Sequence, residues 1–161
     1  MKRRISILLA VILLLSVSAS AASIEVPQIS ENLFLCAKQA LVYLSSGEYE
    51  RLVTLLPFSG VAPSASEWQN FAEGNFLSLT EEVQTEYAVA YWNGLSWTLA
   101  VPVVNPDIDS AETLVLSSAD GITFSGYRYA TWAEVKGEYL FATYVTWNKE
   151  YLGTAPIITA D

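Results

Sequence analysis

The sequence predicts an α+β fold, in which N-terminal helices pack on a curved antiparallel meander sheet of about five strands. Two observations lead to this prediction. Up to about residue 83, apolar residues recur at helical spacing, whereas beyond it they alternate and are interrupted by turn dipeptides. No internal repeat or low-complexity segment appears after the first 21 residues, so we expect a single α+β domain over residues 22–161.

Residues 1–21 have the order of a secretory signal peptide. Residues 2–4 are Lys-Arg-Arg, residues 5–17 form an apolar run, and Ala-Ser-Ala at 19–21 is a small-x-small cleavage pattern. We therefore expect bacterial-type export to an extracellular location, with cleavage after Ala21 or, alternatively, after Ala22. The rival interpretation is an uncleaved anchor, because uncharged residues 5–24 have the length to cross a hydrocarbon core of about 30 Å.

Acidic residues dominate the part that follows the signal. All 17 Asp and Glu residues lie there together with five of the eight Lys and Arg residues, which gives a formal charge of about −12. Such a surface repels phosphate, because nucleic acids and anionic headgroups are bound by Lys and Arg. We expect no nucleic-acid partner, and membrane contact only through an uncleaved signal.

The first helix is expected between Ser30, a suitable N-cap, and Gly47, a suitable stop. Its apolar stripe consists of Leu33, Ala37, Ala40, Leu41 and Leu44. A second helix over 48–56 is expected to end at Pro57. The pair Ser66 and Gln69 has the spacing of a capping box and predicts the start of a third helix, which ends before Gly74.

Five strands are expected in the second half, at residues 86–92, 95–104, 112–119, 122–133 and 138–148. The turn dipeptides between them are Asn93-Gly94, Asp120-Gly121 and Lys136-Gly137. A two-residue loop at Asn93-Gly94 predicts Trp92 opposite Leu95 and Ala90 opposite Trp97. A hairpin at Lys136-Gly137 predicts Tyr129 opposite Tyr144 and Trp132 opposite Phe141.

A resemblance can be named on residues 37–52, Ala-Lys-Gln-Ala-Leu-Val-Tyr-Leu-Ser-Ser-Gly-Glu-Tyr-Glu-Arg-Leu. This helix, which turns at Gly-acidic-Tyr into a second helix, resembles the opening of nuclear-transport-factor-2-like, or cystatin-like cone, domains. The resemblance implies a bent sheet around a long N-terminal helix, often with a pocket and often in a dimer. Such domains usually have a short strand between the second and third helices, where this chain has Phe58 and Val61 around Gly60.

Several chemistries are excluded by composition. The chain has no histidine, which removes His-based catalysis and nearly all zinc sites, and its single cysteine, Cys36, permits no internal disulfide. We expect Cys36 to be a buried, inert thiol on the first helix. No glycine-rich phosphate loop follows a strand. We expect no cofactor, no metal and no assigned catalytic residue.

The remaining acid–base candidates are carboxylates near the ends of strands, where a solvated side chain is the ordinary interpretation. They are Glu86, Asp120, Glu134 and Glu138. The acidic residues of 105–112 have oxygens at a spacing that suits calcium, but they lack the glycine and the distant Glu of an EF-hand loop. We interpret this segment as an acidic turn.

Aromatic residues are unusually frequent, with five Trp and nine Tyr. We expect Trp68, Phe71, Trp92 and Trp97 to lie in the core, together with Trp132 and Phe141. The candidate binding residues are tyrosines on strand faces that carry too little charge for a solvated surface: Tyr87, Tyr91, Tyr127, Tyr129 and Tyr144. The alternative is that helices of the same chain cover both faces of the sheet.

Two classes of function follow from these patterns. The first is a non-catalytic binding domain whose partner is a second copy, forming a homodimer, or a small apolar ligand. The alternative is a small cone-fold enzyme that uses a pocket carboxylate. Carbohydrate binding would require an exposed row of aromatic rings. A deep pocket with a buried Asp or Glu would favour the enzyme, and a closed core would favour the binding domain.

Overall fold

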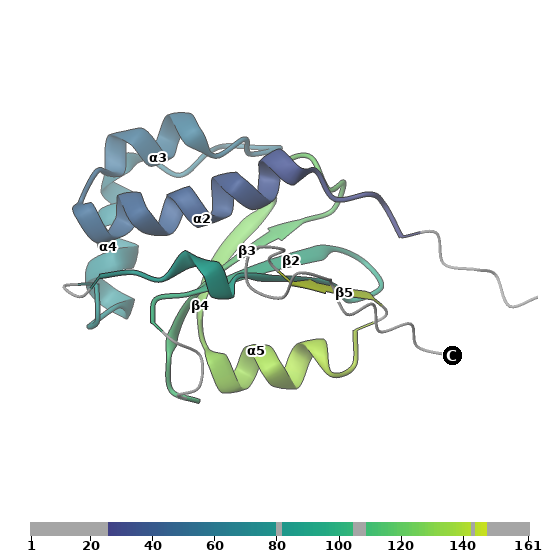
Figure 1. The fold of residues 1–161 in the computed structure, drawn as a ribbon. Helices are drawn as coiled ribbons and strands as arrows, with labels where there is room; N and C mark the ends of the chain where they lie inside the picture. The colour runs from purple at the N-terminus through teal and green to yellow at the C-terminus, as the bar shows by residue number, and fades with distance from the viewer. Residues whose placement is uncertain (1–25, 80–81, 105–108, 143, 148–161) are drawn as a thin grey trace, which may run out of the picture.

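The computed structural model of the chain describes residues 26–79, 82–104, 109–142 and 144–147. These residues form the α+β fold that the sequence predicts. A layer of N-terminal helices covers one face of a five-stranded antiparallel sheet, and one short helix lies on the other face (Figure 1). Within the described ranges, no helix has the length and apolar character needed to cross a membrane.

Helix α2, Glu31–Ser46, begins and ends where the local signals predict. Ser30 occupies the N-cap position, and Gly47 ends the helix in the left-handed conformation with φ of 72°. Its predicted apolar stripe is buried throughout. The long helix of the first half is therefore confirmed in both its limits and its inward face.

Helix α3, Tyr49–Leu55, confirms the second predicted helix, and α4 covers Ala65–Asn75. The prediction of a capping box at Ser66 is wrong, because the box is formed by Ser64 and Glu67. A Glu carboxylate is a stronger acceptor for backbone N–H groups than a Gln amide, and its charge suits the positive end of the helix.

The sheet contains β1, Val89–Trp92; β2, Trp97–Pro102; β3, Glu112–Ser118; β4, Gly126–Thr131; and β5, Tyr144–Trp147. A 3₁₀ turn, η1, at Thr85–Tyr87 precedes it. The strand order is β4-β3-β2-β1-β5. The first four strands form the predicted meander, but the placement of the last strand beside the fourth is wrong: β5 pairs with β1 at the other edge.

The first hairpin is confirmed, but its predicted register is wrong. Trp92 pairs with Trp97 and Ala90 with Leu99, so the loop has four residues. The side-chain oxygen of Asn93 accepts the backbone N–H groups of Leu95 and Ser96, and this local turn holds the longer loop. A shift of two residues leaves every side chain on its predicted face.

The predicted hairpin at Lys136-Gly137 is wrong, because these residues lie inside helix α5, Trp132–Tyr139. Thr131 and Glu134 form a capping box that starts this helix directly after β4. The helix carries the chain from one edge of the sheet to the other.

The pairings predicted from that hairpin fail with it. Tyr129 pairs with Leu114, and Tyr144 pairs with Trp92. Trp132 is buried in α5, as the core prediction required, but Phe141 is 91% exposed and is not a core residue.

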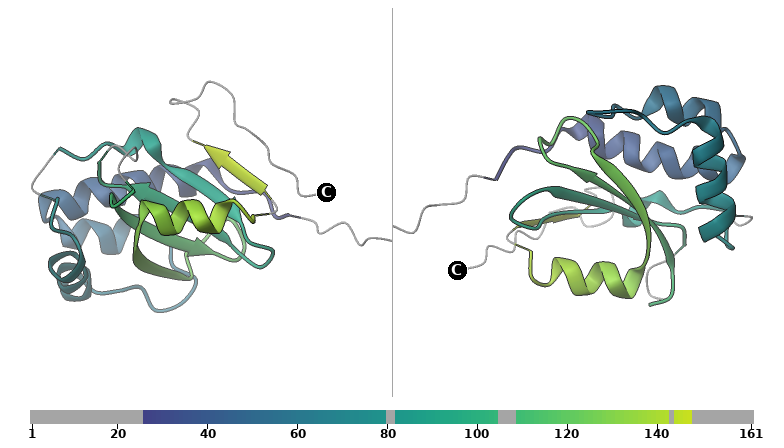
Figure 2. Two further views of the ribbon diagram at one scale, coloured as in Figure 1. Left: turned by 90° about the horizontal axis from the view of Figure 1, so that it is seen from below. Right: turned by 180° about the vertical axis from the view of Figure 1, so that it is seen from behind.

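The two faces of the sheet belong to two separate clusters of buried residues. We call the face toward α2, α3 and α4 the first face; its largest buried side chains include Trp97, Leu99, Leu114 and Leu116. We call the face toward α5 the second face; it carries Val89, Tyr91, Ala100, Val115 and Ala130. Figure 2 shows the sheet lying between these two coverings. Both faces are thus packed against helices of the same chain.

The segment before α2 crosses one end of the sheet. The indole Nε1 of Trp97 donates a hydrogen bond of 2.8 Å to the carbonyl oxygen of Pro27, and the N–H of Ser30 donates one of 2.8 Å to the carbonyl oxygen of Gly121. These bonds attach the start of α2 to the loops at that end of the sheet.

Candidate functional site

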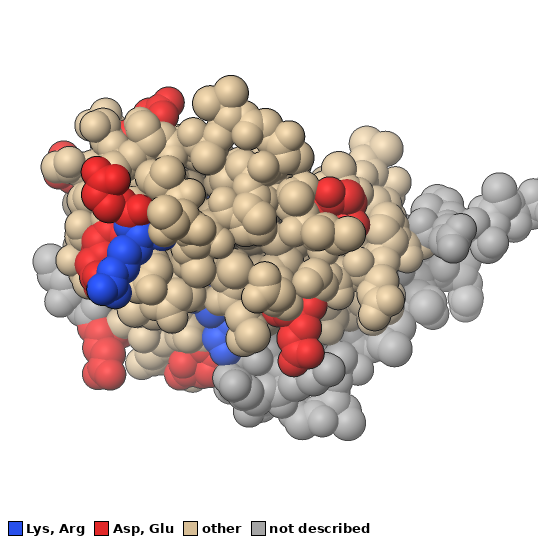
Figure 3. Space-filling view, turned by 90° about the horizontal axis from the view of Figure 1, so that it is seen from above, with Lys and Arg blue, Asp and Glu red and all other residues tan. Residues whose placement is uncertain are grey.

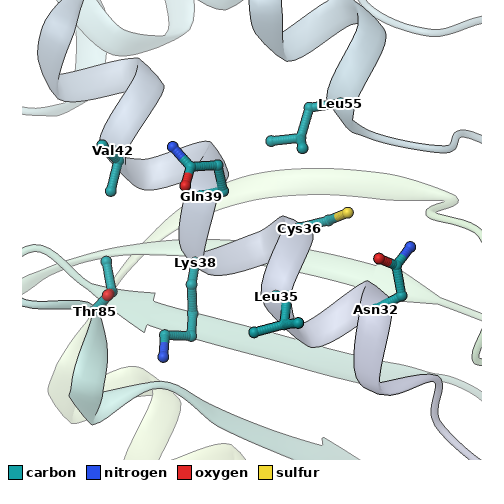
Figure 4. Close-up of a pocket in the computed structure, with 8 residues that line it drawn as sticks. All are labelled: Asn32, Leu35, Cys36, Lys38, Gln39, Val42, Leu55 and Thr85. Atoms are coloured by element: carbon teal, nitrogen blue, oxygen red, sulfur yellow. The ribbon is translucent and has the colours of Figure 1, made fainter.

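A hollow of about 320 Å³ lies on the outer side of α2, between this helix, the end of α3 and η1 (Figure 4). Helix α2 supplies most of the lining because its outward residues recur at helical spacing. The lining residues are Asn32, Leu35, Cys36, Lys38, Gln39, Val42, Leu55 and Thr85. Apolar and polar side chains thus line the hollow together, which is typical of a surface that receives an apolar group of a partner.

Two apolar side chains of this hollow are open to solvent. Leu35 is 53% exposed and Val42 is 37% exposed, and they lie seven residues apart on the same side of α2. The lining includes one basic residue, Lys38, and no carboxylate, in a chain with a formal charge of −9. The hollow is therefore less acidic than the rest of the surface.

Cys36 lies in this hollow as the buried thiol that the sequence predicts. Burial raises the pKa of the thiol above its usual value, because a thiolate is poorly solvated there. A thiol that stays protonated at neutral pH is a weak nucleophile, so the geometry favours binding over covalent chemistry at this site.

A second hollow, of about 360 Å³, lies between the end of α2 and α4. Its lining includes the one carboxylate found in either hollow, that of Glu73. This side chain is exposed and accepts a hydrogen bond from the amide of Gln69 at 2.8 Å. The buried polar residues of the described chain are Thr98, Thr113 and Ser118, so none of its carboxylates lies in the buried setting that a general acid requires.

The five candidate tyrosines do not form one surface. Tyr127, Tyr129 and Tyr144 are half-buried and pack against the core of the first face. Tyr91 is buried on the second face, and Tyr87 lies in η1. The structure therefore separates the tyrosines by the thickness of the sheet.

The tyrosines of β4 belong to an aromatic cluster between the sheet and α4. Tyr127 lies 4.4 Å from Trp68 and 5.0 Å from Phe71, measured between ring centroids, and Tyr129 lies 5.5 Å from Phe76. Desolvation raises the pKa of both phenols. These contacts fix the packing of α4 on the sheet.

Tyr91 is the centre of a polar network beneath α5. Its hydroxyl donates a hydrogen bond to Glu138, and Thr98 also hydrogen-bonds the phenol. Arg128 donates to the same carboxylate at 2.5 and 2.7 Å, so a residue of α5 is bonded to both β1 and β4. Desolvation, followed by the hydrogen bond and charge of Glu138, raises the pKa of Tyr91 far above its ordinary value.

The other candidate carboxylates also have structural partners. Asp120 accepts the backbone N–H groups of Ile122 and Thr123, which lower its pKa strongly. Glu134 caps α5, and its bonds to Thr131 lower its pKa. Glu86 lies in η1.

The proposed acidic turn falls partly outside the described residues, since positions 105–108 are not among them. Of the described residues, Asp109 pairs with Lys136 at 2.5 Å, and Glu112 accepts the N–H groups of Leu77 and Ser78. The described ranges contain no group of three or more acidic, Cys or His side chains placed to hold a metal ion.

One sequence pattern indicates the hollow on α2 but is not among the predictions above. Leu35 and Val42 lie on the side of the helix opposite its buried stripe, where polar residues are ordinarily found. Two apolar residues at that spacing outside the core indicate a contact surface.

The likeness to nuclear-transport-factor-2-like domains remains a prediction. In the region where those domains usually have a short strand, Phe58 forms a single parallel bridge with Phe124. Comparison of the chain with protein-family models, with curated proteins and with solved structures gives no match.

Proposed function

We propose that residues 22–161 are an exported, non-catalytic binding domain, and that the hollow on the outer side of α2 is its binding surface. One observation carries the proposal: Leu35 and Val42 are exposed in the lining of a hollow that has polar side chains but no carboxylate. Apolar side chains on an otherwise acidic surface favour a partner that contributes an apolar group. The partner is a second copy of the chain or a small apolar molecule.

The packing of the sheet supports this choice over an enzyme. Both faces are covered, and the carboxylates near the strands cap helices, hold loops or form ion pairs. The cone-fold enzyme would use Glu73, which is solvent-exposed at the second hollow. Its carboxylate lies at the surface and accepts a hydrogen bond from the Gln69 amide, which is an ordinary structural setting, and the binding domain is therefore preferred.

The test uses the chain beginning at Ala22 and two probes, its own oligomeric state and the dye anilinonaphthalene sulfonate. Sedimentation velocity is expected to give a dimer, or the dye is expected to fluoresce on binding. Leu35→Asp is expected to abolish whichever signal is present, because it places a charge among the apolar side chains that line the hollow.

Leu77→Asp is the matched control, since Leu77 is an exposed leucine outside the hollow. A monomer that binds no dye would overturn the proposal. So would a signal that Leu35→Asp and Leu77→Asp reduce equally.

Export has a separate test. Mass spectrometry of the secreted protein is expected to give a chain that begins at Ala22 or Ser23. An intact Met1 start on protein held in the membrane would contradict cleavage.

A further inference from the structure

Four exposed apolar side chains lie at one end of the sheet. They are Leu95, Ile122, Leu140 and Phe141. The pairing of Trp92 with Trp97, and of Trp97 with Ser118, puts the β1–β2 and β3–β4 loops at the same end. Residues 140–142 arrive there too, because they precede β5, whose first residue pairs with Trp92. We call this the tail end of the domain.

The N-terminal segment enters the domain at the same end. Pro27 and Ser30 are hydrogen-bonded to Trp97 and Gly121, which adjoin the two loops. Figure 1 shows the start of α2 and these loops on one side of the molecule. The eight residues 18–25 separate the described domain from the apolar run 5–17, and a chain of this length spans at most about 29 Å.

The acidic residues are concentrated toward the opposite end. That end contains the start of α3, the end of α4, η1, and the starts of β3 and α5. Its carboxylates are Glu48, Glu50, Glu73, Glu86, Asp109, Glu112 and Glu134, of which Glu48 is paired with Arg51 and Asp109 with Lys136. On the face drawn in Figure 3, most of the acidic side chains lie on the side away from the start of α2.

The tail end has fewer acidic residues. Glu31 and Asp120 lie there, while Glu138, near the end of α5, is paired with Arg128. The domain therefore has an apolar end next to its N-terminal segment and an acidic end away from it. This polarity would orient the domain at a lipid surface, with the apolar end toward the hydrocarbon and the carboxylates in water.

We propose that the tail end is a membrane-contact surface, which enters the headgroup layer of the bilayer that holds residues 5–17. The inference concerns the chain that keeps residues 1–21, the uncleaved form given as the alternative in the sequence analysis, and not the cleaved chain of the proposed function. An apolar surface that enters the interface adds membrane affinity in proportion to the apolar area that it buries. In this form the domain lies on the membrane in one orientation.

The test uses the full chain in phosphatidylcholine vesicles. A polarity-sensitive fluorophore is attached to Leu95→Cys, Phe141→Cys or Leu77→Cys, each combined with Cys36→Ala. Leu77 is the matched control because it is 89% exposed and adjoins Glu112, at the opposite end of β3. We expect a blue shift at positions 95 and 141 and none at 77. An equal shift at all three, or none at 95 and 141, would overturn the proposal.

A second variant tests the surface without labelling the two central side chains. The fluorophore is placed at Ile122→Cys, and Leu95→Asp with Phe141→Asp is added. These positions are exposed, so the melting temperature is expected to stay unchanged. The blue shift at 122 is expected to be lost, and its persistence would contradict the proposal. Because the assay needs no secretion and no ligand in the hollow, failure of the proposed function leaves its result interpretable.

Discussion

The two faces of the sheet are covered in different ways. The first face buries large side chains, including Trp68, Trp97 and Leu114, beneath three helices. The second face is lined mainly by Ala, Val and Thr residues and is covered by a single eight-residue helix. Small residues let α5 approach closely, but they bury little apolar area. Apolar burial therefore dominates on the first face, whereas polar contacts help to fix the helix on the second.

The buried polar side chains of the two faces also differ in their hydrogen bonding. On the first face, the indole N–H groups of Trp68 and Trp92 are buried without an acceptor among the described residues. On the second face, the phenol of Tyr91 is bonded to Thr98 and Glu138. A buried polar group that is paired helps to specify one position for the helix above it.

The largest expected loss of stability comes from a substitution on the first face. Leu41→Ala removes a fully buried side chain of α2 and is expected to lower the free energy of unfolding by about 2–5 kcal/mol. Val42→Ala, at the neighbouring exposed position, is expected to cost about 0.5 kcal/mol or less. Urea denaturation measures both. Equal losses would mean that α2 does not supply the main core of this face.

The next largest loss of stability is expected at Gly121, which contacts the segment before α2, and it tests whether this segment packs at the edge of the first face. Gly94 and Gly121 both have positive φ, but a Cβ at Gly121 would lie 2.4 Å from the carbonyl oxygen of Gln28, while one at Gly94 meets open space. Gly94→Ala is expected to cost about 1–2 kcal/mol. Gly121→Ala is expected to cost about 2–4 kcal/mol, because the clash adds to the strain. Thermal unfolding that gives equal losses would contradict the contact with Gln28.

On the second face, the hydroxyl of Tyr91 is the group to remove. Tyr91→Phe is expected to cost about 1–2 kcal/mol, since the hydroxyl bonds a charged acceptor in a buried position. A double-mutant cycle with Glu138→Gln is expected to give a coupling energy of about 1 kcal/mol. Additive losses would mean that the network does not hold α5.

The smallest expected effect is the dependence on pH of the stability that Tyr91 and its hydrogen-bond partners contribute. The folded-state pKa of Tyr91 lies above that of an unfolded tyrosine, about 10. The unfolded chain therefore loses its phenolic proton first, so the contribution of Tyr91 is complete below about pH 10 and is lost as the pH rises above it. Urea denaturation in alkaline buffers is expected to show a flatter decline for Tyr91→Phe than for the unsubstituted chain. Parallel declines would contradict the assignment.

Local signals determined much of the structure of the first half. Ser30 and Gly47 bound α2, and its apolar stripe became its buried face, because caps and periodicity act within one or two turns of helix. The period of two in β1 and β2 likewise assigned Trp92 and Trp97 to one face, although the register was wrong by two residues. The spacing of Thr131 and Glu134 is that of a capping box and indicates the start of α5. The prediction instead took the Lys136-Gly137 dipeptide as a hairpin turn.

Only the tertiary structure decided the pairing of β5, the covering of the second face and the hollow on α2. Which edge of the sheet receives the last strand depends on where α5 ends, and no local pattern encodes that distance. Tyr91 and Tyr129 lie in strands that are far apart in the sequence, and the pairing of the sheet placed them on opposite faces. Composition had excluded histidine chemistry and disulfides, and the periodicity of α2 placed Leu35 opposite its buried stripe. The hollow itself formed only when α3 and η1 packed beside α2, because a hollow depends on residues that are distant in sequence.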